Sequence, residues 1–451
     1  MTTAADAIAR THREEWARIV AAIARRFGGL DIAEDSAAEA FAAAAARWSS
    51  GGVPPNPAGW LMTTAQRKAI DRLRREAVRD DRHREALLLH DDSPAEPVGA
   101  IDDDRLRLVF VCCHPVLALE ARVALTLRIV GGLTVVEIAH AFLVPSTTMG
   151  QRITRAKAKI AAARVPYRVP EADDLPERVA GVLAVLYLIF NEGYLASGAE
   201  SEPLRRDLSA EAIRLTRLVR ELLPGDPEVE GLLALMMLTE ARADARVSRD
   251  GELVRLDEQD RGSWDRRLID EGLALVRGHD DASARGDGAP GRYQLLAAIN
   301  AVHVSAPTAR DTEWGRIVSL YTRLEQIDPS PIVTLNKAIA VAQYDSPDVA
   351  LAMLERLADS LDAHHAFHAS RAELLRLAGR SLEAHAAYER AITLAGNSAE
   401  VAHLVRRRDQ LSDPLTDSRS TGIRSTDAHT LADRPTDTDQ TEDTDTRRNA
   451  S

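Results

Sequence analysis

The sequence has few of the residues on which several common classes of protein depend. Of its 451 residues only Cys112 and Cys113 are cysteines, and they are adjacent, so the chain has neither a disulfide framework nor the spaced pairs of a zinc site. They are expected to be reduced thiols in a core. Aromatic residues make up 4 % of the chain, and strands favour aromatic and β-branched side chains. A chain dominated by alanine, leucine, arginine and glutamate is therefore expected to be all-α.

Long apolar runs are also missing. None reaches the ~18 residues needed to span a bilayer, and the first residues, MTTAADAIARTHREEW, lack the basic-then-apolar order of a signal peptide. We therefore expect a cytoplasmic protein that makes no membrane contact. The length of 451 residues predicts two to four domains.

The motifs of common enzymes are absent as well. The sequence has no glycine-rich phosphate loop, no HExxH and no nucleophile elbow. Acids at 257–265 (Asp257, Glu258, Asp260 and Asp265) and histidines at 364–368 (His364, His365 and His368) lack catalytic spacing. The acids are expected to pair with Arg255, Arg261 and Arg266, and the histidines to be partly solvated helix residues. We predict no enzyme activity, no catalytic residue, no metal and no cofactor.

Charge is distributed unevenly along the chain. The whole sequence carries −12, yet residues 105–168 hold ten Lys and Arg against two Asp and Glu, and residues 91–104 hold six acids and no base. Affinity for nucleic acid depends on local neutralisation of phosphates and is screened beyond about 8 to 10 Å. The acidic total therefore does not exclude DNA binding by the basic segment.

Apolar periodicity divides the chain into modules. A helical module is predicted at 6–89, an acidic linker at 90–104, a second module at 105–165, a helical extension at 175–411 and a disordered tail at 412–451. In the first module one helix should end at Gly28-Gly29, and the next should restart at Asp31 with a capping box to Glu34. A third, basic helix is expected from Ala58 to Arg84. In the second module a single helix is expected between Arg105 and Gly131.

The extension contains an internal repeat of 34 residues. Asp345, Ala350 and Leu354 recur as Gly379, Ala384 and Tyr388. This is the tetratricopeptide period, in which a small residue lets two antiparallel helices approach closely. Repeats are therefore predicted near 328–397, with helices at 228–243 and 291–306 stacking beneath them.

Residues 134–160 read as two short helices around a turn at LVPS. Val135, Val136, Ile138, Ala139 and Phe142 are expected to form the apolar face of the first helix. The second helix has an apolar face of Met149, Ile153, Ala156 and Ile160. A basic face, Thr148, Arg152, Arg155 and Lys159, has the same spacing. A recognition helix needs such a face, because its polar groups touch base edges and its cations hold phosphates.

The helix at 58–76, AGWLMTTAQRKAIDRLRRE, interleaves Trp60, Thr63 and Thr64 with basic residues. Aromatic and polar groups can hold unpaired bases while cations follow the backbone, as in recognition of single strands. The alternative is that Trp60 belongs to the core and that the charges form a solvated face.

In order, these motifs resemble the extracytoplasmic-function-type sigma factors of bacterial RNA polymerase, over residues 10–165. LIFNEGY at 188–194, the stretch at 241–266 and the repeats resemble the long C-terminal extension of one subgroup. The resemblance implies a protein that binds RNA polymerase core and promoter DNA and directs initiation. It implies core-binding residues Glu34, Asp35, Glu39 and Phe41. It implies −10 contacts by Trp60, Thr64, Arg67, Lys68, Arg72 and Arg75. It implies −35 contacts by Thr147, Thr148, Gln151, Arg152, Arg155 and Lys159.

Two other readings stay open at this point. The chain could be a helix-turn-helix transcriptional regulator, or a tetratricopeptide scaffold, that does not bind polymerase. The discriminating feature is the helix at 58–76, because a repressor needs no reader of single strands. Under the favoured reading, the C-terminal half is expected to be regulatory, and its helical repeats could bind a further protein or peptide.

Overall fold

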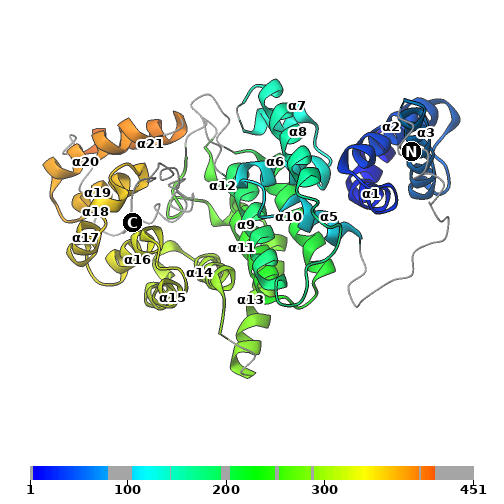
Figure 1. The fold of residues 1–451 in the computed structure, drawn as a ribbon. Coiled ribbons are helices and arrows are strands. Elements are labelled where there is room, and N and C mark those ends of the chain that lie inside the picture. Colours follow the sequence, from blue (N-terminus) through cyan, green and yellow to red (C-terminus); the bar gives the residue numbers. More distant parts are fainter. Residues whose placement is uncertain are drawn as a thin grey trace, which may run out of the picture.

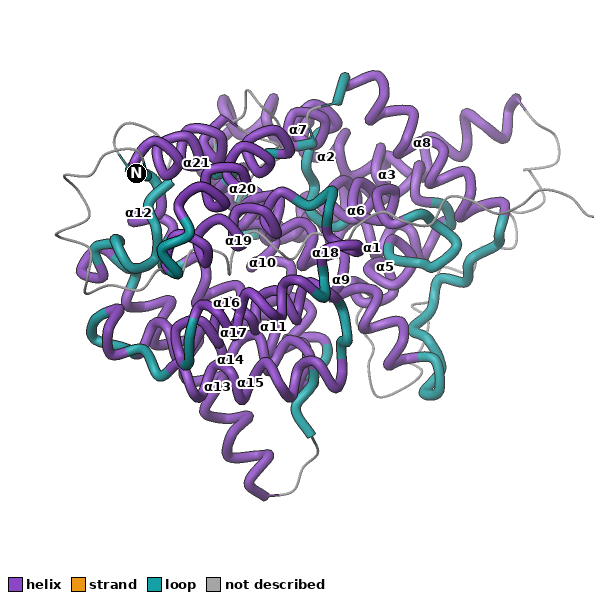
Figure 2. The backbone as a smooth tube through the Cα atoms, turned by 90° about the vertical axis from the view of Figure 1, so that its left-hand side faces the viewer, coloured by secondary structure: helices purple, strands orange, loops and turns teal. Residues whose placement is uncertain are grey.

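The computed structural model describes residues 4–79, 104–142, 144–194, 204–248, 253–285, 289–395 and 398–411. Within these ranges every regular element is a helix, and β pairing is limited to one isolated bridge between Val247 and Leu253 (Figure 2). The all-α prediction is confirmed. No helix in the described ranges combines the length and the apolar character needed to cross a membrane. The predicted tail at 412–451, and the predicted linker except Asp104, lie outside these ranges.

The N-terminal module is a bundle of three helices, α1 (Ala4–Phe27), α2 (Leu30–Gly51) and α3 (Pro57–Arg79). Alanines at 33, 37, 40 and 44 form the buried stripe of α2, and their small side chains let the three helices pack closely. The start of α2 differs from the expectation. Gly29, with φ of 76°, is the N-cap, and no side chain caps the helix. Asp31 and Glu34 therefore do not form a capping box, and both are bonded to a distant lysine.

The second module has four helices, α5 (Asp104–Cys112), α6 (Leu119–Ile129), α7 (Val135–Ala141) and α8 (Ser146–Ala162). The single helix expected before Gly131 is wrong. Pro115 lacks an N–H and disfavours helical backbone before it, so the chain turns at 113–118 and starts again as α6. Cys112 and Cys113 are buried free thiols in this core.

The extension begins with α9 (Leu175–Tyr194) and α10 (Arg206–Leu222), which pack as a pair. Helix α11 (Pro227–Glu240) is apolar on all sides and lies between α9, α10, α13 (Arg266–Arg285) and α14 (Arg292–Ser305). Gly231 permits this arrangement, because a Cβ there would lie 2.6 Å from the backbone nitrogen of Gln294. Short helices α12 (Ala243–Arg246), η1 (Arg261–Ser263) and η2 (Ala309–Asp311) connect these elements.

The chain then continues as helical pairs. One pair is α15 (Trp314–Ile327) with α16 (Pro331–Tyr344), and another is α19 (His365–Leu377) with α20 (Ser381–Leu394). Between them in the chain are α17 (Pro347–Glu355), which packs on α16 and α19, and the short α18 (Ala358–Leu361). The last helix, α21 (Ser398–Gln410), packs on α20. The small repeat positions Ala350 and Ala384 are fully buried, and Leu354 and Tyr388 are 1 % and 2 % exposed. These four residues pack as a 34-residue helical repeat requires.

The modules are arranged in chain order from one end of the molecule to the other (Figure 1). The N-terminal bundle contacts the second module through α1 and α5, and α9 of the extension packs against α5 and α6. Buried side chains form one continuous core from α1 to α16, and a second cluster is formed by residues of α16–α21. The two modules that carry the predicted DNA-binding helices are thus in direct contact.

Candidate nucleic-acid and polymerase interface

Helices α7 and α8 form the predicted helix-turn-helix. At the start of α7, the backbone N–H of Thr134 donates to the Glu137 carboxylate (2.7 Å), and the N–H of Glu137 donates to the Thr134 hydroxyl (3.2 Å). This reciprocal cap fixes where α7 begins. Val136 is 67 % exposed, so its assignment to the apolar face was wrong. Ile138 and Ala139 are buried as expected.

Helix α8 presents the predicted polar face to solvent. Met149, Ile153, Ala156 and Ile160 are buried, which directs the other side of the helix outward. On that side the exposed residues are Thr147, Thr148, Gln151, Arg155 and Lys159. Arg152 is partly buried and pairs with Glu120 of α6 (3.3 Å). The N-terminal turn of α8 thus exposes hydroxyl and amide groups, and its later turns expose cations.

Helix α3 carries the second predicted DNA-binding set. Arg67 and Arg75 are exposed. Lys68 pairs with Glu39 (3.1 Å), and Arg72 pairs with Asp35, so α3 and α2 are joined by ion pairs. Two acidic residues predicted to bind polymerase therefore lie beside two basic residues predicted to bind DNA. All four side chains are at least 32 % exposed and can exchange partners at low cost.

Three other predicted contact residues are held within the bundle. Trp60 is partly buried and packs edge-on against Trp48, with ring centres 5.6 Å apart. The Thr64 hydroxyl donates to the carbonyl of Trp60 (2.8 Å). Phe41 is 7 % exposed and packs against the rings of His12 and Trp16. In this arrangement Phe41 supports the bundle and presents almost no surface to a partner.

Glu34 occupies an unexpected position between the two modules. Its side chain is 7 % exposed and accepts a hydrogen bond from Nε of Arg128 on α6 (2.6 Å). It also pairs with Lys157 of α8, whose ammonium bonds Asp31 as well (2.8 Å). Burial alone would lower the pKa of Lys157, but its hydrogen bonds to Asp31 and Glu34 raise it above the usual value. An acid predicted to bind polymerase is thus engaged by the helix predicted to bind DNA.

Apolar packing surrounds this ion-pair cluster. The indole N–H of Trp16 donates to the carbonyl of Ile129 (3.0 Å). Gly132, with φ of 76°, lies so close to α1 that a Cβ would come within 2.7 Å of the His12 ring. Burial lowers the pKa of His12, with Arg214 and Arg128 contributing in the same direction and Glu137 opposing them. The sequence did not predict this contact between α1 and the segment 129–132, because no local pattern identifies a partner more than a hundred residues away.

The extension contacts both modules. Arg178 of α9 donates to the carbonyl of Phe110 (2.6 Å) and lies over its ring. Arg214 of α10 pairs with Glu211 and donates to the carbonyl of Arg13 in α1 (3.1 Å). One surface of the extension therefore bridges the two modules.

The polar groups considered for enzyme chemistry have structural partners. Asp257 pairs with Arg255 (3.1 Å), as predicted, and the carboxylates of Asp260 and Asp265 accept backbone N–H bonds at helix starts. His368 bonds the carbonyl of Asp362 (2.7 Å). Arg261 differs from the prediction, because it donates to the carbonyls at 303 and 306. Among the described residues no group of His, Cys, Asp or Glu side chains is placed to hold a metal ion.

Comparison with known families divides the chain in the same order. Residues 13–79 match the family described as Sigma-70 region 2, and residues 107–160 match Sigma-70, region 4. Residues 178–279 match a family of unknown function, DUF6596. An uncharacterized protein of Rhizobium meliloti (strain 1021) is 43 % identical over 402 residues, which cover 88 % of this chain and 94 % of that relative. No solved structure matches the chain.

Proposed function

The chain belongs to the sigma-70 family, as an extracytoplasmic-function-type sigma factor with a C-terminal extension, and we propose that it binds RNA polymerase core and directs initiation at specific promoters. Its two sigma-70 regions give it a role in polymerase-directed transcription. The finer assignment rests mainly on α8, whose buried apolar face leaves a row of polar and basic side chains exposed beside a well-capped α7. A protein with this activity would work in the cytoplasm.

Region 4 would bind the −35 duplex through α8. Gln151 can form a bidentate bond to adenine in the major groove, and Thr147 and Thr148 lie at the N-terminal turn, where such helices approach base edges. Arg155 and Lys159 lie one and two turns further on and would hold phosphates. Arg152 can also bind a phosphate by releasing Glu120, because the Glu120 carboxylate is exposed and can be solvated by water.

Region 2 would bind the −10 element and the polymerase. Arg67 and Arg75 are exposed on α3. Lys68 and Arg72 can leave their carboxylate partners for phosphates, which would release Asp35 and Glu39 of α2 for a basic polymerase surface. Trp60 is only partly buried against Trp48, and an exposed part of its ring face would stack on an unpaired base.

Promoter binding requires the two modules to separate. The −10 and −35 elements are about 25 base pairs apart, or roughly 85 Å at 3.4 Å per base pair. In the structure the modules touch, since Glu34 of α2 is bonded to Arg128 and Lys157. The connecting residues 80–103 span at most about 80 Å when fully extended. This length is sufficient, because each module adds its own width to the span.

The C-terminal half would regulate this opening. Arg178 attaches the extension to region 4, and Arg214 attaches it to region 2, so a movement within the extension changes how stably the modules remain together. If the chain binds polymerase only in its open form, its apparent affinity equals the affinity of the open form multiplied by the fraction of open molecules. The extension can therefore set activity without touching polymerase or DNA.

Co-elution of the full chain with sigma-free RNA polymerase core tests the main proposal. We expect a stable complex, and Glu39→Lys should weaken it at least about tenfold by placing a cation against the basic surface. Glu15→Lys, on the neighbouring helix α1, is the matched control. Failure of the full chain to bind active core, or equal losses in both variants, would contradict the assignment.

The regulatory proposal has a separate test. Arg214→Ala removes the contact between α10 and region 2, whereas Arg220→Ala on the same helix removes only a pair with Glu230 inside the extension. We expect Arg214→Ala alone to change the amount of transcript from a cognate promoter. Identical transcription by both variants and by the unmodified chain would refute control through this contact.

A further inference from the structure

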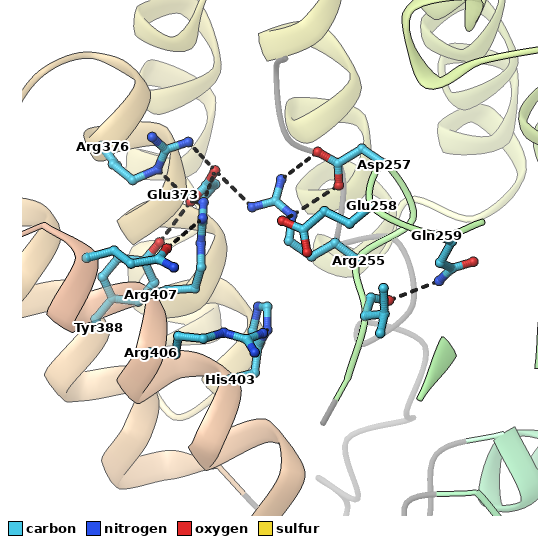
Figure 3. A network of polar contacts seen from close by, with 12 residues as sticks. Arg255, Asp257, Glu258, Gln259, Glu373, Arg376, Tyr388, His403, Arg406 and Arg407 are labelled. Carbon is cyan, nitrogen blue, oxygen red and sulfur yellow. Dashed lines mark hydrogen bonds and ion pairs between the residues drawn. The ribbon is translucent and has the colours of Figure 1, made fainter. Parts of the chain in front are cut away.

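A second candidate site lies in the extension, outside the DNA-binding modules. The segment 254–258 lies beside α19, which carries Glu373 and Arg376, and α21, which carries His403, Arg406 and Arg407 (Figure 3). Between this segment and α21 is a hollow of about 270 Å³, bordered by Arg255, Glu258, His403 and Arg406, among others. A cavity needs only about 10 to 15 Å³ to hold one water, so this hollow is large enough for a small molecule.

The hollow continues into an apolar recess. A narrower cavity of about 80 Å³ shares Leu253, Arg255, His403 and Arg407 with it. Apolar side chains of three helices make up most of its other walls, including Ile339, Ala369, Leu374, Leu377 and Leu404. Polar side chains also line it, namely His365, Ser370, Glu373, Tyr388 and Glu400. The combined space thus has one polar, cationic end and one apolar end, which is the usual character of a site for a small organic ligand.

Arg255, Arg406 and Arg407 border the polar end, and carboxylates hold two of them, Arg255 and Arg407, in position. Arg255 is 4 % exposed and lies between Asp257 (3.1 Å) and Glu373 (3.5 Å). Arg407 bonds Glu373 (2.7 Å), which also accepts from Arg376 and from the hydroxyl of Tyr388 (Figure 3). Burial alone would raise the pKa of Glu373, but Arg407, Arg376 and Arg255 hold it well below its usual range. The carboxylate therefore stays charged and keeps the arginines in place.

His403 borders the hollow beside these arginines. Burial lowers its pKa to about 4, and Arg255, Arg407 and Arg406 contribute in the same direction. Its imidazole is therefore neutral at pH 7 among three cations. Glu258, whose side chain is 52 % exposed, is the acid at the rim. An anion that entered would lie against the guanidinium of Arg406, whose N–H groups can replace part of its hydration with charge-assisted hydrogen bonds.

We propose that this hollow binds a small organic anion, with a carboxylate or phosphate head against Arg406 and His403 and a short apolar chain in the recess between α19 and α21. Bound there, the ligand contacts both the Val254–Glu258 segment and the last helix of the repeats. Neither element belongs to the DNA-binding modules, so the inference holds or fails independently of polymerase binding.

Calorimetry and thermal melting of the full chain without polymerase test this proposal, with hexanoate, hexyl phosphate and 1-hexanol as probes at constant ionic strength. We expect one of the two anions to bind saturably with a Kd below about 1 mM, and hexanol to bind at least about tenfold more weakly. The tighter anion identifies the head group. Comparable binding of hexanol, or no saturable binding of either anion with a Kd below about 1 mM, would overturn the proposal.

Matched variants locate the binding. Arg406→Gln should weaken the tighter anion at least about tenfold, and so should Gln410→Glu, which adds an acid at the exposed rim without disturbing the core. Arg408→Gln is the control, because Arg408 pairs with Glu389 and Asp409 and does not border the hollow. Equal affinities of the Arg406 and Arg408 variants, both with the melting temperature of the unmodified chain, would place the anion elsewhere and refute the site.

Discussion

The contact between the modules can be tested through the pair of Glu34 and Arg128. Their side chains are 7 % and 17 % exposed, so this pair belongs with buried rather than surface salt bridges. Breaking such a pair by removing one partner costs about 3 to 5 kcal/mol, because the other charge stays buried. Lys157 continues to neutralise Glu34 when Arg128 is absent, which reduces the loss. We therefore expect a coupling of about 2 kcal/mol, or roughly thirtyfold in the equilibrium between closed and open forms.

A double-mutant cycle of Glu34→Gln, Arg128→Met and both together isolates this coupling. The readout is energy transfer between dyes on cysteines introduced at Ser50 and Thr154, which are exposed on α2 and α8. The native thiols should not react, because burial raises the pKa of Cys112 well above its usual value and that of Cys113 to about 11. Urea titration of the transfer signal gives the closed-to-open free energy of each variant by linear extrapolation.

The pair of Glu120 and Arg152 is the control for this cycle. It lies within one module, at 3.3 Å, with a carboxylate that is 65 % exposed. Its coupling in the same assay should be near zero, since opening leaves both partners together. A coupling below about 0.5 kcal/mol for Glu34 and Arg128 would refute the view that this pair holds the modules closed.

Three further predictions follow from particular residues. In the closed form His12 lies against Gly132 of the second module, and burial lowers its pKa from 6.5. The closed form therefore favours the neutral ring and should lose stability as the pH falls below about 6.5. His12→Asn should abolish this pH dependence of the energy-transfer signal. Arg155→Ala should reduce the slope of log affinity for −35 DNA against log salt by about 0.9, whereas Thr154→Ala should not change it, as measured by fluorescence anisotropy. Glu373→Gln should lower the unfolding free energy of the extension by about 2 to 4 kcal/mol in urea denaturation followed by circular dichroism. Glu383→Gln, at an exposed pair, should leave it unchanged.

Predictions from the sequence succeeded where burial depends only on the periodicity of a single helix. Met149, Ile153, Ala156 and Ile160 recur at helical spacing, and all four are buried. The 34-residue repeat likewise predicted that Ala350 and Ala384 lie between paired helices. Both patterns are local, because burial of one face follows from the period of the helix whatever covers it.

Predictions failed where the deciding partner is distant in sequence. Asp31 and Glu34 have the spacing of a capping box, but Gly29 starts the helix, and both acids bond Lys157 on another module. Because α2 already begins at Leu30, Asp31 lies inside the helix and lacks the non-helical backbone that an N-cap residue needs. Val136 was assigned to the apolar face because valine is apolar. Its side chain is 67 % exposed, because other helices contact only one side of the seven-residue α7.

Closure by these pairs has a consequence for how the two partners bind. Glu34 lies on the helix proposed to contact polymerase, and Lys157 lies on the helix proposed to contact duplex DNA, so each interaction favours the same open form. Two ligands that prefer one state of a common equilibrium strengthen each other by the same factor. The largest possible factor is the reciprocal of the open fraction in the free chain. If the closed form is stabilised by a few kcal/mol, the free chain should bind DNA weakly and the polymerase complex should bind it strongly. The ratio of these two affinities is then limited by the stability that the ion pairs of Glu34 give to the closed form.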